Sequence, residues 1–207
     1  FGARVVSVDP RDDGVVVATE GDEIEAGVVV LTAGSWLPKL AAGLVALPPL
    51  RVTQEQPAYF APRDDKAAWP IFVHRLTAGE ALEGVAAYGL PTPGHGLKVG
   101  EHGTGSEVDP DRRTDPDPGG LTRLSRYVER WLPGLDPEPR ELISCLYTTA
   151  PGEHFVAGQV GRLVVGSPCS GHGFKFAPAM GDLLADVALA GARIPVMWGT
   201  VSSPDGL

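Results

Sequence analysis

The chain has 207 residues, 43% of them hydrophobic, and a formal net charge of -9 at pH 7. This length and composition allow a sizeable buried core, in one domain or in two lobes. The negative charge argues against nucleic acid as a partner, and no apolar run reaches the roughly 18 residues that span a bilayer. Two cysteines make no disulfide framework, so we expect a cytoplasmic protein.

The first 50 residues alternate short apolar runs with turn residues. The runs predict strands at 4–8, 15–19 and 28–31, followed by a helix at 36–45. The first two strands should pair around the turn at 12–14, and Pro48 and Pro49 should close the helix.

The middle of the chain favours an antiparallel sheet. Between residues 51 and 98, strand-like runs at 58–60, 71–73 and 85–88 alternate with turn residues. The segment 109–120 is rich in Asp and Pro and predicts an exposed loop. An amphipathic helix should follow, with one apolar face made by Leu121, Leu124, Val128, Trp131 and Leu132.

The C-terminal third carries the pattern with the most chemical meaning. Residues 141–149 predict a strand on which Cys145 and Tyr147 point to the same face. A buried strand at 162–166, a glycine-rich turn at 170–176 and a helix then follow. The helix has apolar residues at helical spacing: Phe174, Ala177, Met180, Leu183, Leu184 and Val187. Backbone N–H groups at such a turn can meet an anionic or electron-rich ligand.

Three short motifs in this third carry a family resemblance. They are Cys145-Leu146-Tyr147-Thr148, Glu153-His154-Phe155 and Gly171-His172-Gly173-Phe174-Lys175-Phe176. Together they resemble the C-terminal signature of the monomeric sarcosine oxidase and N-methyltryptophan oxidase family of FAD-dependent amine oxidases. Two upstream segments, 88–102 and 28–36, resemble that family's central hairpin and the strand that returns to its flavin domain.

The resemblance implies a mixed α/β (α+β) fold that is part of a two-domain FAD oxidoreductase. Residues 1–45 would belong to an incomplete FAD-binding domain, 46–140 to a substrate domain with an antiparallel sheet, and 141–207 would return to the FAD-binding domain. No segment fits the G-x-G-x-x-G turn that holds the FAD pyrophosphate. We therefore expect the C-terminal half of a longer enzyme, inactive as an isolated chain, whose partner would be a complementary N-terminal chain. A natural short paralogue is the alternative.

The resemblance also implies how the cofactor is held. Cys145 would form a thioether with the 8α-methyl carbon of FAD, whereas without this context it would be a small buried hydrophobe. The other cofactor-binding residues would be Gly171, His172, Gly173, Phe174 and Lys175. We interpret Cys169 as a packing residue and His172 mainly as a residue that shapes the turn.

Two lysines are candidates for the mechanism. The chain has 13 arginines and four lysines, and Lys98 and Lys175 lie in glycine-rich motifs, where a compact ammonium is specifically suited. The resemblance implies that Lys175 binds the substrate carboxylate and that Lys98 promotes electron transfer to oxygen beside the flavin. The alternative for either lysine is a solvated surface side chain.

Three further residues complete the candidate site. The resemblance implies that Tyr88 and His102 take part in catalysis and substrate binding. Because Tyr147 shares a face with Cys145, we expect it to line the site as a further catalytic residue. As alternatives, His102 is a structural histidine and Tyr147 an ordinary sheet aromatic.

The implied reaction is oxidation of a secondary amine, such as the N-methyl amino acid sarcosine, to an imine, while oxygen is reduced to hydrogen peroxide. The partners would be the amine and molecular oxygen, with no nucleic acid and no membrane. Two alternatives are an oxidase of a cyclic imino acid such as pipecolate, and a non-catalytic fragment that binds a partner chain and no flavin. No metal is expected, because His154, His172, Cys145 and Cys169 are too widely spaced for a zinc site.

Overall fold

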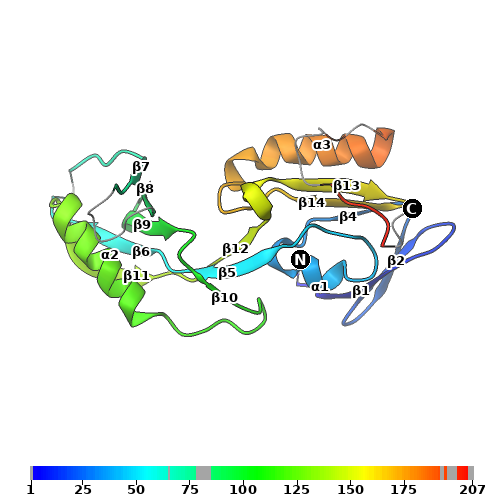
Figure 1. The fold of residues 1–207 in the computed structure, drawn as a ribbon, viewed down its shortest axis with the longest axis horizontal. Helices are drawn as coiled ribbons and strands as arrows, with labels where there is room; N and C mark the ends of the chain where they lie inside the picture. The colour runs from blue at the N-terminus through cyan, green and yellow to red at the C-terminus, as the bar shows by residue number, and fades with distance from the viewer. Residues whose placement is uncertain (1, 65, 78–84, 192–193, 195–199, 205–207) are drawn as a thin grey trace. The chain divides into compact units, whose positions relative to one another are not determined.

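The structure is a computed structural model that describes residues 2–64, 66–77, 85–191, 194 and 200–204. The chain forms two compact units (Figure 1). The first unit comprises Phe1–Arg51 with Thr148–Leu207, and the second comprises Val52–Tyr147. The divisions that the family resemblance implies fall at 45/46 and 140/141, whereas the compact units divide at 51/52 and 147/148.

The first unit begins with an antiparallel sheet of three strands. The strands are β1 (Val5–Pro10), β2 (Val15–Thr19) and β3 (Glu23–Ala26), in the order β1-β2-β3. The pairing of β1 with β2 confirms the predicted hairpin. Val15 at the start of β2 is buried and packs in one core cluster with Leu31 and Leu37.

A second sheet in this unit contains both predicted buried strands. Its strands are β13 (Val156–Val160), β14 (Leu163–Ser167) and β4 (Val29–Leu31), and β14 pairs parallel with β4. Helix α3 (Ala177–Ala190) lies along one face of this sheet (Figure 1), where Val164 packs with Met180 and Leu184. Because apolar clusters cover both faces, every residue of β14 is buried.

Two predictions in the first unit were wrong in detail. The predicted helix at 36–45 is a 3-10 turn, η1 (Gly34–Trp36), followed by a single turn, α1 (Leu37–Leu40). Gly43 has a φ of +77°, a left-handed conformation that a helix cannot continue through. Phe174 was expected on the apolar face of α3, but it begins a 3-10 turn, η3 (Phe174–Phe176), and is 95% exposed.

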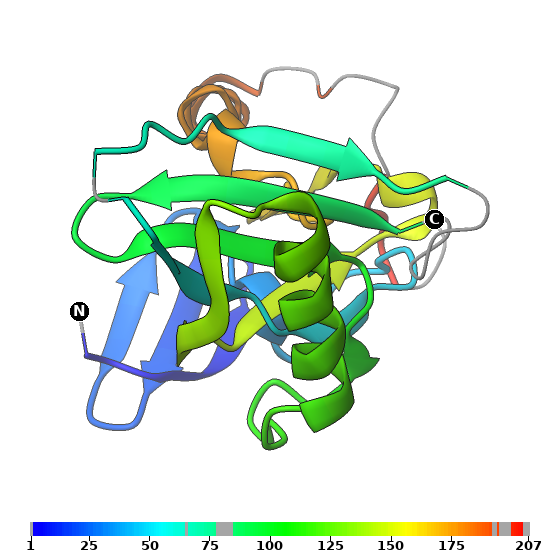
Figure 2. The same cartoon turned by 90° about the vertical axis from the view of Figure 1, so that its left-hand side faces the viewer.

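The second unit is built on a five-stranded antiparallel sheet in the order β11-β6-β9-β8-β7. The strands are β6 (Ala58–Pro62), β7 (Phe72–Arg75), β8 (Ala86–Thr92), β9 (Gly96–His102) and β11 (Leu135–Leu142). This confirms the predicted antiparallel sheet. Helix α2 (Pro118–Trp131) lies across one face of it (Figure 2), and Leu124 and Val128 pack there on Leu97 and Val99.

Helix α2 begins earlier than the expected end of the loop at 120. Asp117 is its N-cap, and its carboxylate accepts hydrogen bonds from the backbone N–H groups of Gly119 at 2.9 Å and Gly120 at 2.8 Å. Pro118 at the first helical position has no N–H to satisfy, which favours this start. Among the described residues, no helix combines the length and apolar character needed to cross a membrane.

The predicted strand at 141–149 is two strands in two different sheets. β11 ends at Leu142, and β12 (Cys145–Thr149) pairs with β5 (Arg51–Glu55) in the order β10-β5-β12, where β10 is Ser106–Glu107. The break falls opposite Pro57, whose carbonyl accepts a hydrogen bond from the N–H of Ile143 at 2.9 Å. Proline has no N–H with which to continue the pairing between β6 and β11, so the strands change partners at this point.

Candidate functional site

One face of the sheet in the second unit gathers several predicted site residues. Leu97 and Val99 on β9 are fully buried against α2, so Lys98, Gly100 and His102 lie on the opposite face. Tyr88 on β8 pairs directly with Gly100 and shares that face. We call this surface, made by Tyr88, Lys98, Gly100 and His102, the tyrosine face.

The ring of Tyr88 crosses β9 over Gly100. A Cβ atom on Gly100 would lie 2.6 Å from both Cζ and the hydroxyl oxygen of Tyr88, so only glycine leaves room for the ring. Tyr147 on β12 acts electrostatically on Tyr88. The glycine is therefore part of the site, although the sequence analysis assigned it no role.

Tyr147 also meets the other residues predicted for this site. Its ring centroid lies 5.4 Å from that of His102. Cys145, two residues away on the same face of β12, is a half-buried free thiol. The structure thus brings Tyr88, His102, Tyr147 and Cys145 together within the second unit.

The electrostatics of this cluster keep both phenols neutral at physiological pH. Burial raises the pKa of Tyr88, and the ionisable groups of Tyr147 and Cys145 raise it further. Burial, followed by the negative charge of Glu55, raises the pKa of Tyr147 to about 12. Both hydroxyl groups can therefore donate and accept hydrogen bonds.

Glu55 on β5 is a residue that the sequence analysis missed. Its side chain is 1% exposed, yet its charge acts on both Tyr88 and Tyr147. The hydroxyl of Thr53 donates to Oε1 at 2.6 Å, and the N–H of Gly105 donates to Oε2 at 3.0 Å. A glutamate in the run Val52-Thr53-Gln54-Glu55-Gln56 was the available signal, but polar residues on both faces of a strand look solvent-exposed.

The remaining predicted residues lie in the first unit, in the turn between β14 and η3. Ser170 and Gly171 have positive φ angles of 44° and 72°. A Cβ atom on Gly173 would collide with the carbonyl oxygen of Pro168, so the turn requires glycine there. The Ser170 hydroxyl donates to the carbonyl of His154 at 3.1 Å, and its N–H donates to the carbonyl of Thr148 at 2.9 Å.

Some side chains of this turn are fixed by contacts with the protein, whereas others are exposed to solvent. His172 stacks on Phe155 with ring centroids 5.0 Å apart, and its Nδ1 lies 2.8 Å from the carbonyl oxygen of Ser170. These contacts hold the turn in shape. Lys175 is exposed, with Nζ 5.6 Å from the ring centroid of Phe176. Burial raises the pKa of the Cys169 thiol, which suits the packing role predicted for it.

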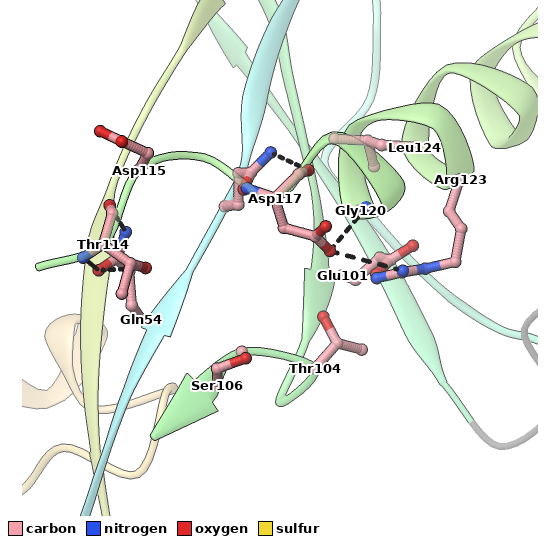
Figure 3. Close-up of a pocket in the computed structure, with 12 residues that line it drawn as sticks. Gln54, Glu101, Thr104, Ser106, Thr114, Asp115, Asp117, Gly120, Arg123 and Leu124 are labelled. Atoms are coloured by element: carbon pink, nitrogen blue, oxygen red, sulfur yellow. Dashed lines mark hydrogen bonds and ion pairs between the residues drawn. The ribbon is translucent and has the colours of Figure 1, made fainter. Parts of the chain in front are cut away.

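A polar recess of about 60 Å³ lies on the α2 side of the second unit (Figure 3). There the Glu101 carboxylate accepts a hydrogen bond from Arg123 Nη2 at 3.0 Å, and Arg123 Nη1 lies 3.9 Å from Asp117. The bond to Glu101 raises the pKa of the Arg123 guanidinium. This ion pair ties the start of α2 to β9.

Gln54 on β5 and Gln56 just after it line the same recess and hold the loop before α2. The Gln54 side chain donates to the carbonyl of Thr114 at 2.8 Å and accepts from its N–H at 2.9 Å. Gln56 makes the matching pair with Asp117, at 3.1 Å and 2.7 Å. Because these amides are already used for loop contacts, we interpret the recess as structural.

The donor set of the tyrosine face fits a flavin ring. A half-buried free thiol at Cys145 beside two neutral phenols suits a flat aromatic group that carries an electrophilic methyl substituent. Lys98 adds a cation on the same face. In the described part of the chain, no three His, Cys, Asp or Glu side chains lie close enough together to hold a metal ion.

Comparison with known proteins agrees with this chemistry. The profile of a family described as "DAO: FAD dependent oxidoreductase" matches residues 1–187. Monomeric sarcosine oxidase of Bacillus sp. (strain NS-129) is 30% identical over 207 residues, covering 92% of this chain and 52% of that protein. Peroxisomal sarcosine oxidase of Homo sapiens is 34% identical over 203 residues, covering 91% and 50% respectively.

The fold is shared with a solved oxidase. The open form of NikD, an amino acid oxidase of nikkomycin biosynthesis, matches with a TM-score of 0.82 and 26% identity, over 97% of this chain and 55% of that one. The chain spans about half the length of the curated relatives it matches. The resemblance predicted from the three C-terminal motifs is confirmed, and the chain belongs to the FAD dependent oxidoreductase family that includes the monomeric sarcosine oxidases.

Proposed function

We propose that the protein to which this chain belongs oxidises a secondary amine, such as an N-methyl amino acid, to an imine and forms hydrogen peroxide from oxygen. The observation that carries the proposal is the tyrosine face, where Tyr88 and His102 meet Tyr147 beside the free thiol of Cys145. FAD would supply the redox chemistry when bound, as the acceptor of the hydride equivalent from the C–H bond next to the nitrogen and as the donor of those electrons to oxygen.

Cys145 is the residue that would hold the flavin covalently. A thioether requires a thiol that is accessible and unpaired, and Cys145 is half-buried and free. Cys169 is a less suitable candidate, because burial raises the pKa of its thiol and so disfavours the thiolate nucleophile.

Tyr88 and Tyr147 would hold the amine end of the substrate. Their raised pKa values keep both phenols protonated at neutral pH, so they present hydroxyl groups rather than charges to the nitrogen. The close approach of its ring to Gly100 fixes Tyr88, which limits the entropy lost when a ligand is ordered beside it.

The two lysines would serve different parts of the reaction. Lys98 on the tyrosine face places a fixed cation where negative charge develops on oxygen, a stabilisation that is strong in a site that excludes water. Lys175, exposed in the glycine turn, is suited to bind the carboxylate of an amino acid substrate.

The test uses the FAD-loaded protein that contains this chain. Anaerobic mixing with sarcosine, N-methyltryptophan or pipecolate should bleach the flavin absorbance with at least one of them, and air should then yield peroxide. Flavin should stay with the protein after acid precipitation. Cys145→Ala should release it, whereas the matched variant Cys169→Ala should retain it. Flavin that no secondary amine reduces would overturn the proposed function.

A further inference from the structure

The carboxylate of Glu55 is a buried charge to which the proposed reaction gives no role. Its side chain is 1% exposed, and its neighbour Thr53 is equally buried. The two hydrogen bonds that it accepts come from neutral donors, the Thr53 hydroxyl and the Gly105 N–H. Within the described part of the chain, no lysine, arginine or histidine forms a salt bridge with it.

Glycine at position 105 makes room for this carboxylate. A Cβ atom on Gly105 would lie 2.6 Å from Oε1 of Glu55, so the loop after β9 can cover the carboxylate only with glycine at that position. Burying a charge against neutral partners is unfavourable unless something nearby compensates it. A cation that arrives with a ligand would supply that compensation.

The charge of Glu55 acts on the two tyrosines beside which the proposed substrate amine would bind. Its charge is felt by both Tyr88 and Tyr147, and β5, which carries it, pairs with β12, which carries Tyr147. Along β9, Lys98 precedes Gly100 and His102, whereas Gly105 and Glu55 lie beyond that end of the strand. The tyrosine pair thus has a cation on one side and an anion on the other.

We propose that Glu55 is the anion that makes the tyrosine face select a positively charged amine, so that the substrate binds as its ammonium form with that end toward Glu55. The inference rests on the proposed function, since it names the charge state of the same substrate. Glu55 acts through space and through the phenols, and is therefore a positioning residue. Like a lysine side chain with its pKa of about 10.4, an alkylamine carries its proton at neutral pH.

A pair of ligands with the same shape and different charge tests this in the FAD-loaded protein. Trimethylammonioacetate is permanently cationic and has no N–H, and 3,3-dimethylbutanoate replaces its nitrogen by carbon. Both carry the same carboxylate, so the ratio of their dissociation constants isolates the charge. We expect the cationic ligand to bind about tenfold more tightly, the order of magnitude of one attractive charge pair in a protein site. Equal binding by the wild type would overturn the inference without any variant.

Variants then assign the effect to Glu55. Glu55→Gln should bring the ratio close to one, whereas Glu55→Asp, which keeps the charge, should preserve most of it. Glu101→Gln is the matched control, because it also removes a buried carboxylate of the second unit but on the α2 side, and it should keep the wild-type ratio. A ratio that persists in Glu55→Gln would overturn the role of this residue.

A further readout is independent of amine oxidation. Removing the charge of Glu55 should make Tyr147 and Tyr88 ionise at lower pH, measured as tyrosinate absorbance in an alkaline titration. If no secondary amine is oxidised but this shift and the ligand ratio are found, the proposed function fails and the charge selection stands. If amines are oxidised but neither is found, the inference about Glu55 fails alone.

Discussion

The second unit buries one carboxylate on the α2 side, on β9, and another on the side of the tyrosine face, on β5, and the two have different partners. On the α2 side, Glu101 is 8% exposed and forms an ion pair with Arg123 at 3.0 Å. On the tyrosine side, Glu55 is 1% exposed and accepts hydrogen bonds from a hydroxyl and a backbone N–H. The better-buried charge is thus the one without a cation in the described part of the chain.

This difference separates a structural role from a functional one. The Glu101–Arg123 pair joins α2 to β9, and its charges are balanced within the fold. Among the described residues no cation pairs with Glu55, and its charge acts on the two tyrosines. Changes on the tyrosine face should therefore alter ligand binding and rate, whereas changes on the α2 side should alter stability.

The largest expected effect is on rate, from Lys98→Met on the tyrosine face. Removing this cation should slow the oxygen half-reaction by about 10²-fold or more, while reduction by substrate changes far less and the free energy of unfolding stays close to that of the wild type. Stopped-flow measurement of the two half-reactions decides this. Lys175→Ala should show the opposite pattern, with weakened binding of a carboxylate substrate. Equal losses in both half-reactions for Lys98→Met would assign that lysine a structural role.

The next effect is on stability, from Arg123→Met on the α2 side. It leaves the buried Glu101 carboxylate unpaired, which should lower the free energy of unfolding by about 2 kcal/mol, less than for a fully buried pair because the arginine side chain is 42% exposed. Combining it with Glu101→Gln removes both charges and should recover part of the loss, which urea unfolding measures. Single and double variants that are equally unstable would argue against the pairing.

Much of the fold follows from patterns that are local in sequence. The apolar residues of β14 and the helical spacing from Ala177 to Val187 predicted a buried strand and a helix, and both are present. The two-residue spacing of Cys145 and Tyr147 placed them on one face, because strand geometry alone fixes that relation. Family motifs then located the candidate site, although not the roles of its residues.

Features that depend on distant partners could not be predicted in this way. The break between β11 and β12 is set by Pro57, which lies far away in the sequence. The burial of Glu55 depends on Gly105 folding over it from the loop after β9. In the sequence, Glu55 lies between two glutamines and resembles a residue on a solvated strand.

The smallest expected effect is the dependence of stability on alkaline pH. Tyr147 has a pKa of about 12 in the folded chain, against about 10 for an unfolded tyrosine. Below pH 10 both states keep the proton, and the stabilising contribution is fully present. Between about pH 10 and 12 the unfolded chain releases the proton and the folded chain retains it, so stability should fall as pH rises.

Tyr147→Phe removes this titration and should give a shallower decline across that window, measured by urea unfolding at a series of pH values. Glu55→Gln should also make the decline shallower, since it removes one cause of the raised pKa of Tyr147, whereas Glu101→Gln should leave the slope unchanged. Identical slopes for the wild type and Tyr147→Phe would show that the tyrosine is not held in its neutral form, and the electrostatic distinction between the two faces would then fail.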